Sequence, residues 1–415
     1  MEKTNVFSEH AESISILVYT QSFFCDPESF DYFKNANLLN SIHVYFMPLL
    51  GTPDKVPPVK TGIYKHVPEE NAICSYAVFS DCTGRAYLSS NTPQRKTDEE
   101  LSIIAEEVML RHPFHPLTFD YTVASDSWCE EHKDYSNVTP YSEAKDILRL
   151  FLVNKKEFEV VDHYYIDEFF YYTYRHKVLF PKYQAFWSST LESKNELDTN
   201  TASALGNRLT LLSMCLDNAR IEAYKIQNNT TAMHLKYHIS YLLLLITGVF
   251  DSLAWIINNL YTLGFGGKKR RQIDVINPDF RKEVEIKSAA ISSLLSDADY
   301  INKVEAIREL RDRIVHRNFI DTISSGDRAN RQNYLWIDQV ASDKLRKAGF
   351  EEKAYFIRNG DLNAVVILEL LDFLQDTVVN IVNCFLNQIS SEIYHSSTND
   401  SVSKLLNLPS DPYVL

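Results

Sequence analysis

The longest apolar segment of the chain covers His234–Leu263, and its most apolar part is the run Tyr241–Phe250. Asp251 interrupts this run, and the polar residues Asn258 and Asn259 follow soon after it. A membrane-spanning helix needs about 20 consecutive apolar residues. The segment therefore predicts a long buried helix in a soluble protein, without membrane contact. The N-terminus has no signal-peptide pattern, so we expect a cytoplasmic protein.

Further segments of the C-terminal half have helical apolar spacing. They are Leu209–Ile226, Phe280–Leu295, a segment capped by Asp297 or Asp299 that ends near His316, and Leu362–Ile393. Together with the apolar segment they predict an all-α bundle of long up-down helices over residues 205–393. An irregular insert at about residues 320–360 contains a β-like run, Tyr334–Ile337. Residues 394–415, rich in Ser, Asn and Pro, are expected to form a flexible tail.

The N-terminal half has short β-rich runs, which are typical of a mixed α/β domain. The runs are residues 13–20, 41–46, 74–79 and 86–89, of which the last two flank a predicted hairpin turn, and residues 97–111 predict a helix. Residues 155–186 are dense in Tyr and Phe, and their pattern fits strands or a helix. The polar stretch Glu192–Asn207 is the candidate domain boundary. We therefore predict an α+β chain with a mixed α/β sensor or regulatory domain at 1–195, followed by the all-α helical domain with its insert.

The net charge of −13 argues against a protein that coats nucleic acid generally. Residues 1–204 carry 18 basic and 30 acidic side chains, whereas residues 205–390 carry 23 and 22. A local phosphate contact is therefore easier to place in the C-terminal half. The sharpest basic run follows the apolar segment, and it predicts either a guide for an RNA backbone or a solvated loop. The candidate RNA-binding residues are Lys268, Lys269, Arg270, Arg271 and Arg317.

The segment Arg311-Asp312-Arg313-Ile314-Val315-His316 has residue types that suit phosphodiester chemistry. On a helical wheel Arg311 falls inside an apolar arc, so its charge needs a partner. Asp312 and His316 lie four residues apart, which allows a carboxylate to hydrogen-bond an imidazole and fix its tautomer. A histidine can take a proton from a ribose 2′-hydroxyl or give one to the leaving 5′-oxygen. An arginine can hold the phosphate as negative charge builds.

Other chemistry-bearing patterns are weaker. His234 and His238 have a spacing that can bind a metal, but no Glu follows His234 and no third ligand is evident. The P-loop, GxSxG and HExxH patterns are absent from the sequence. The six cysteines form no CxxC pair and fit free thiols in a reducing cytosol. We therefore expect neither a metal nor a cofactor.

The motif and its helical setting resemble the HEPN superfamily. The motif of that family is an arginine, a polar residue, three more residues and a histidine, which matches Arg311, Asp312 and His316. The apolar helix Tyr241–Tyr261 resembles an early HEPN helix that carries an inward acidic residue, and Asp251 stands at that place. The resemblance covers roughly residues 205–390 and does not extend to the N-terminal half.

The resemblance implies a four- or five-helix bundle that forms a homodimer, with the two Arg/His sets in a cleft at the two-fold interface. Catalytic members are metal-independent endoribonucleases that leave a 2′,3′-cyclic phosphate. Carried over, Arg311 and His316 would be catalytic, Asp312 would support them, and Asp251 would orient Arg311 or His316. Many such proteins are bacterial toxins or phage-defence effectors, in which another domain senses a trigger or binds a partner protein. The insert at about 320–360 departs from the minimal bundle.

Two alternatives remain open at this point. In the first, the chain is a non-catalytic HEPN protein that binds a nucleotide or scaffolds a complex, and Arg311 and His316 hold a phosphate without cutting. In the second, the helical domain is purely structural, with Arg311 in a buried ion pair to Asp251.

Overall fold

The described residues of the chain fall into two compact units, which divide at Tyr164 and are treated one at a time. The computed structural model describes residues 6–8, 11–19, 32–33, 36, 39, 41–47, 64–67, 72–74, 77–80, 86–89, 119–131, 137–157, 159–160, 164–165, 168–193, 196–225, 228–314, 322–325, 332–350, 355–359 and 362–393. The expected helix at 97–111 and the expected tail at 394–415 lie outside these residues.

The N-terminal unit is built on a six-stranded sheet with the order β4-β3-β2-β1-β7-β8. Its strands are β1 (Ile14–Tyr19), β2 (Ile42–Met47), β3 (Tyr64–Val67), β4 (Ala72–Cys74), β7 (Tyr121–Ala124) and β8 (Val138–Pro140). The four strands β2, β1, β7 and β8 pair in parallel, and β3 and β4 extend the sheet in antiparallel fashion. The alternating residues Ile14, Ile16 and Val18 of β1 are fully buried, as one covered face of a sheet requires.

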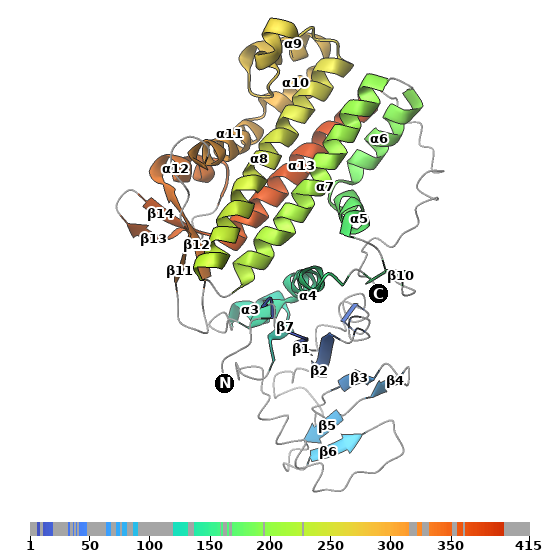
Figure 1. Ribbon diagram of the computed structural model, residues 1–415, viewed down its shortest axis with the longest axis vertical. Coiled ribbons are helices and arrows are strands. Elements are labelled where there is room, and N and C mark those ends of the chain that lie inside the picture. The colour runs from blue at the N-terminus through green and yellow to red at the C-terminus, as the bar shows by residue number, and fades with distance from the viewer. Residues whose placement is uncertain are drawn as a thin grey trace. The chain divides into compact units, whose positions relative to one another are not determined.

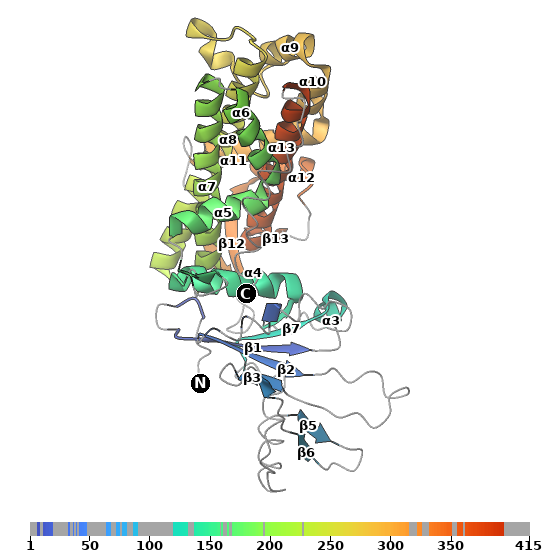
Figure 2. The same cartoon turned by 90° about the vertical axis from the view of Figure 1, so that its right-hand side faces the viewer.

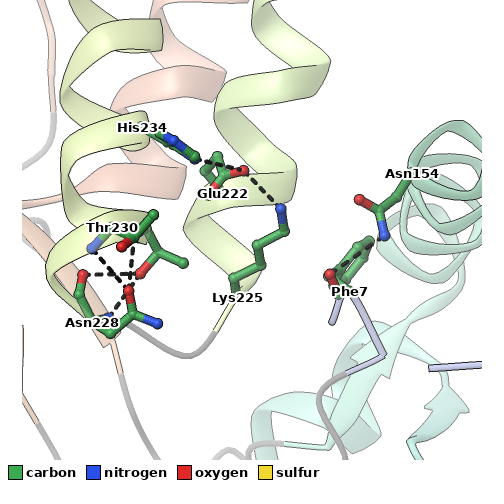
Figure 3. Close-up of polar contacts among 8 residues, drawn as sticks. Phe7, Asn154, Glu222, Lys225, Asn228, Thr230 and His234 are labelled. Carbon is green, nitrogen blue, oxygen red and sulfur yellow. Dashed lines mark hydrogen bonds and ion pairs between the residues drawn. The ribbon is translucent and has the colours of Figure 1, made fainter. Parts of the chain in front are cut away.

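This unit contains the helices α3 (Asp126–Glu131) and α4 (Tyr141–Lys155). The side-chain amide of Asn154 in α4 donates to the backbone oxygen of Phe7, which ties the start of the chain to this helix (Figure 3). A separate hairpin pairs β5 (Ala77–Ser80) with β6 (Ala86–Ser89), which confirms the predicted hairpin. β9 (Glu159–Val160) pairs with β10 (Tyr164–Tyr165).

The C-terminal unit is helical, and its long helices α7, α8 and α13 lie side by side in both views (Figures 1 and 2). Its helices are α5 (Glu168–Leu179), α6 (Pro181–Ser193), α7 (Glu196–Tyr224), α8 (Asn229–Leu260), the 3-10 turn η3 (Gly267–Gln272), α9 (Pro278–Lys287), α10 (Ala289–Ser296), α11 (Ala298–Asp312), α12 (Gln339–Lys347) and α13 (Ile367–Ile393). The aromatic stretch that fitted strands or a helix therefore contains both β9 and β10 and the helices α5 and α6.

The predicted buried helix is α8. Asn228 caps it, since its side chain accepts hydrogen bonds from the backbone of Thr230 and Thr231 (Figure 3). α8 is long and apolar enough to cross a membrane by length and composition, but 67% of its most apolar part is buried inside the structure. This burial is what the core helix of a soluble bundle shows.

The domain boundary differs from the expected one near residue 195. The polar stretch Glu192–Asn207 is not a linker, because most of it belongs to α7, in which Ala202 and Leu205 are fully buried in the core. Phe180 and Phe186, on either side of the start of α6, join the same core. The helical unit therefore begins at Tyr165.

Two other predicted helices differ from the helices that the structure shows. The segment Phe280–Leu295 is broken at Ser288, which ends α9 and caps α10 through its hydroxyl. Leu362–Val366 forms a strand, and only the residues from Ile367 onward are helical.

The insert contains an antiparallel sheet with the order β11-β12-β14-β13, and α12. The strands are β11 (Thr322–Ser325), β12 (Gln332–Asp338), β13 (Tyr355–Asn359) and β14 (Leu362–Val366). The predicted β-like run Tyr334–Ile337 lies within β12 and is confirmed. Leu335 and Val365 are fully buried in the helical core, so the insert and the bundle share one core. Helices together with a parallel and an antiparallel sheet agree with the predicted α+β class.

Candidate functional site

The motif begins on α11, which forms where the sequence predicts it. Asp297 caps the helix by accepting hydrogen bonds from two backbone amides. Val304, Ile307 and Leu310 are fully buried, so the predicted apolar arc faces the core.

The helix changes character inside the motif. α11 ends at Asp312, and Arg313 and Ile314 continue it as a π-helical turn. Turns of this kind are rare and frequently occur at functional sites. The next residues, including His316 and Arg317, lie outside the described residues. Of the candidate catalytic pair, the structure therefore describes Arg311 alone.

Arg311 is partly buried, with 32% of its side chain exposed. Its Nη1 atom lies 2.8 Å from Oδ1 of Asp312. Its Nε atom is buried and has no hydrogen-bond partner among the described residues. A buried donor without a partner is costly and uncommon, so Arg311 retains a donor for another acceptor.

The geometry bears on two expected contacts. The carboxylate of Asp312 pairs with the neighbouring Arg311, whereas its expected contact with His316 lies outside the described residues. Asp251 was considered as a buried ion-pair partner of Arg311, but Asp251 is exposed, and within the described part of the chain Arg311 pairs with Asp312 alone.

Asp251 nevertheless lies within electrostatic range of the motif helix. The protein atoms around its carboxyl group partly remove water and raise its pKa, although the residue is exposed. The positive charges of Arg308, Arg208 and Arg311 act in the opposite direction, and the negative charge of Asp274 adds to the increase. Arginines of α7 and α11 thus act electrostatically on Asp251 of α8.

Arg308 and Asp274 form the best-defined ion pair near the motif. Nη1 and Nη2 of Arg308 lie 2.7 and 2.6 Å from the two carboxylate oxygens of Asp274, in a forked arrangement. Burial lowers the pKa of Arg308, but the hydrogen bonds and charge of Asp274 outweigh it, so the pKa is raised overall. Since Asp274 follows η3 closely, this pair anchors the basic turn to α11, one helical turn before Arg311.

The basic turn η3 presents its cations to solvent. All four basic residues are exposed: Lys268, Lys269, Arg270 and Arg271. Nζ of Lys269 lies 6.0 Å from the ring centre of Phe265, and the guanidinium of Arg270 lies 5.4 Å from that of Trp255. The basic run, for which the sequence predicts either an RNA guide or a solvated loop, forms a 3-10 turn in which two of the cations lie near aromatic rings.

The end of α11 is joined to the insert by charged side chains. Arg313 lies 2.8 Å from Glu309 on its own helix and also pairs with Asp338, while Lys344 of α12 lies 3.0 Å from Glu309. Burial raises the pKa of Glu309, but hydrogen bonds from Lys344 and Arg313 outweigh it, so the pKa is lowered overall. Asp338 additionally caps α12. This network joins the end of α11 to the insert.

The histidine pair considered for a metal site has other surroundings. Nδ1 of His234 lies 3.9 Å from Glu222, whose carboxylate accepts a 2.7 Å hydrogen bond from Lys225 (Figure 3). Burial lowers the pKa of His238, and this outweighs the charge of Glu222. In the part of the chain that the structure describes, no three His, Cys, Asp or Glu side chains are grouped as metal ligands.

Sequence reasoning missed two neighbours of the motif, Asp274 and Arg208. The sequence around Asp274 gives no hint of its ion pair with Arg308, which joins residues 34 positions apart. Arg208 had one sequence signal, the glycine at 248 in the middle of the apolar helix, whose significance appears only in the structure.

Comparison with known proteins does not identify a relative. No protein-family model matches the chain, and no curated protein or solved structure matches it either.

Proposed function

We propose that the chain is a metal-independent endoribonuclease of the HEPN type. In the proposed reaction His316 takes the proton from a ribose 2′-hydroxyl, and the 2′-oxygen attacks the adjacent phosphorus. The bond from phosphorus to the 5′-oxygen breaks, and that oxygen receives a proton from a protonated histidine. The products are a 2′,3′-cyclic phosphate and a 5′-hydroxyl end. Arg311 stabilises the negative charge that develops on the phosphate.

The observation that carries this proposal is the environment of Arg311. Its guanidinium is held at the end of a well-packed helix by Asp312 and keeps a buried Nε donor without a partner among the described residues. Asp251 lies within electrostatic range, and the ion pair of Arg308 anchors the exposed basic turn to the same helix. Such an arrangement suits a phosphate ligand, because the cations are oriented before the ligand arrives.

The resemblance extends the proposal to assembly and biological role. A homodimer would bring two motif sets together, and α8 carries exposed apolar side chains that such an interface would bury. These are Met233, Tyr237, Tyr241 and Leu244. The N-terminal unit would sense a trigger or bind a partner protein, as in bacterial toxins and antiphage effectors of this type.

The proposal is tested by incubating the purified chain with RNA in the presence of a metal chelator. Wild type is expected to cut, and the variants Arg311→Ala and His316→Ala are expected to leave the RNA intact. Arg346→Ala, which changes an arginine paired with Asp343 on α12, is the matched control. Fragment ends with a 2′,3′-cyclic phosphate support cleavage, whereas nucleotide binding without turnover supports the non-catalytic alternative.

A further inference from the structure

Arg208 of α7 lies directly over Gly248 of α8. A Cβ atom at position 248 would lie 2.0 Å from Nη1 and 3.2 Å from Cζ of Arg208. Glycine disfavours a helix interior because it leaves the backbone more freedom to lose. Its place in the middle of this long helix therefore has a local physical reason: the absence of a side chain lets the guanidinium rest on α8.

This crossing places Arg208 about one turn of α8 from Asp251. Asp251 follows Gly248 by about one turn of α8, and its pKa responds to the charges of Arg308, Arg208 and Arg311 together. Arginines of α7 and α11 thus act electrostatically on one exposed carboxylate of α8.

The arginines differ in how their charges are balanced. Asp274 holds Arg308 through two hydrogen bonds, and Asp312 pairs with Arg311. Arg208 is exposed, and among the described residues it has no ion-pair partner. It is therefore the cation of this group that is most available to an external anion.

We propose that Arg208 binds a backbone phosphate of RNA next to the phosphate held at Arg311, and that Gly248 positions it. A guanidinium suits this task, since its planar donors match phosphate oxygens in a forked pair. The identity of the ligand as RNA rests on the proposed nuclease function.

The test measures binding of a fluorescent single-stranded RNA oligonucleotide in the His316→Ala background over a range of salt concentrations. Arg208→Gln is expected to weaken binding about tenfold. It should also reduce the slope of log K against log salt by about 0.7, the value for one phosphate contact on a single strand. Arg346→Gln on α12 is the matched control and should change neither quantity.

Gly248→Ala provides a second test that leaves Arg208 in the chain. The contacting atom is the end of a flexible side chain, and alanine favours the helix, so this variant should fold and unfold at a temperature no lower than wild type. It should weaken RNA binding as Arg208→Gln does, and the double variant should show no further loss. This test remains available even if Arg208→Gln does not fold.

The outcomes separate this inference from the proposed nuclease. RNA binding that depends on Arg208 and Gly248, without any cleavage by wild type, would support the inference and contradict the nuclease. Cleavage by wild type with unchanged RNA affinity and salt slope in both variants would overturn the inference alone.

Discussion

We expect the ion pair between Arg308 and Asp274 to stabilise the packing of the basic turn η3 against the motif helix α11. Replacing Arg308 with Met keeps most of the aliphatic stem but leaves the Asp274 carboxylate without its forked partner. The variant should therefore be less stable and should loosen the segment from η3 to α9.

The size of the effect follows from the burial of the pair. The side chains of Arg308 and Asp274 are 19% and 29% exposed. Breaking a fully buried ion pair costs about 3–5 kcal/mol, whereas exposed pairs contribute about 0.2–1 kcal/mol. We therefore expect Arg308→Met to lower the free energy of unfolding by about 2 kcal/mol. In a double-mutant cycle with Asp274→Asn the coupling should be about 1–2 kcal/mol.

Urea denaturation of the four proteins of this cycle measures the coupling, and hydrogen exchange locates the change. Exchange should accelerate in residues 267–287 of Arg308→Met and stay unchanged in the N-terminal unit. The control is Lys303→Met, which removes an exposed pair with Asp299 on the same helix and should cost less than about 0.5 kcal/mol. A coupling below about 0.5 kcal/mol, or unchanged exchange in residues 267–287, would refute the anchoring role.

The remaining predictions concern the stability of the fold in acid, the boundary of the helical unit and the end of α11. Burial, and to a smaller extent Lys177, lowers the pKa of His176 to about 4, so the folded state keeps this ring neutral. The stability that the neutral His176 ring contributes is fully present above the unfolded pKa of about 6.5. This stability is lost as the pH falls toward 4, by up to about 3 kcal/mol. Urea unfolding of His176→Gln at pH 7.5 and 5 should therefore show a weaker loss at low pH than wild type, and identical pH dependence would contradict this. A fragment of residues 165–393 should fold as a helical unit, whereas a fragment of residues 205–393 should aggregate because it lacks α5, α6 and the start of α7. Circular dichroism and gel filtration distinguish the two fragments. A stable 205–393 fragment would argue against the boundary at Tyr165. Arg313→Gln should lower kcat for RNA cleavage about tenfold with little change in KM, since this change releases the end of α11. A restored kcat in Arg313→Lys would support a positioning role for Arg313. An unchanged kcat in Arg313→Gln would exclude that role.

The sequence predicts those elements whose signal is local. The apolar periodicity of α8, the cap at Asp297 and the apolar face of α11 are visible without the structure, and each is confirmed. The first part of α7 was missed because its core positions include small residues, Ala202 and Gly206, which weaken the apolar pattern.

Features that depend on distant partners could not be predicted. The predicted helix breaks at Ser288, whose hydroxyl donates a hydrogen bond to Glu392, more than a hundred residues away. Leu362–Val366 is a strand because it pairs with β12 across the insert, although its pattern continues into the helix that follows. The same limit applies to the site: the motif indicates Arg311, but the crossing of Arg208 over Gly248 depends on how α7 packs on α8.

The most direct test of the central claim is the chemistry of the RNA ends. RNA treated with wild type in the presence of a metal chelator should carry 2′,3′-cyclic phosphate and 5′-hydroxyl ends, and RNA treated with His316→Ala should not. Equal cleavage by wild type and His316→Ala, or an RNA that stays intact with folded, dimeric wild type, would contradict the account.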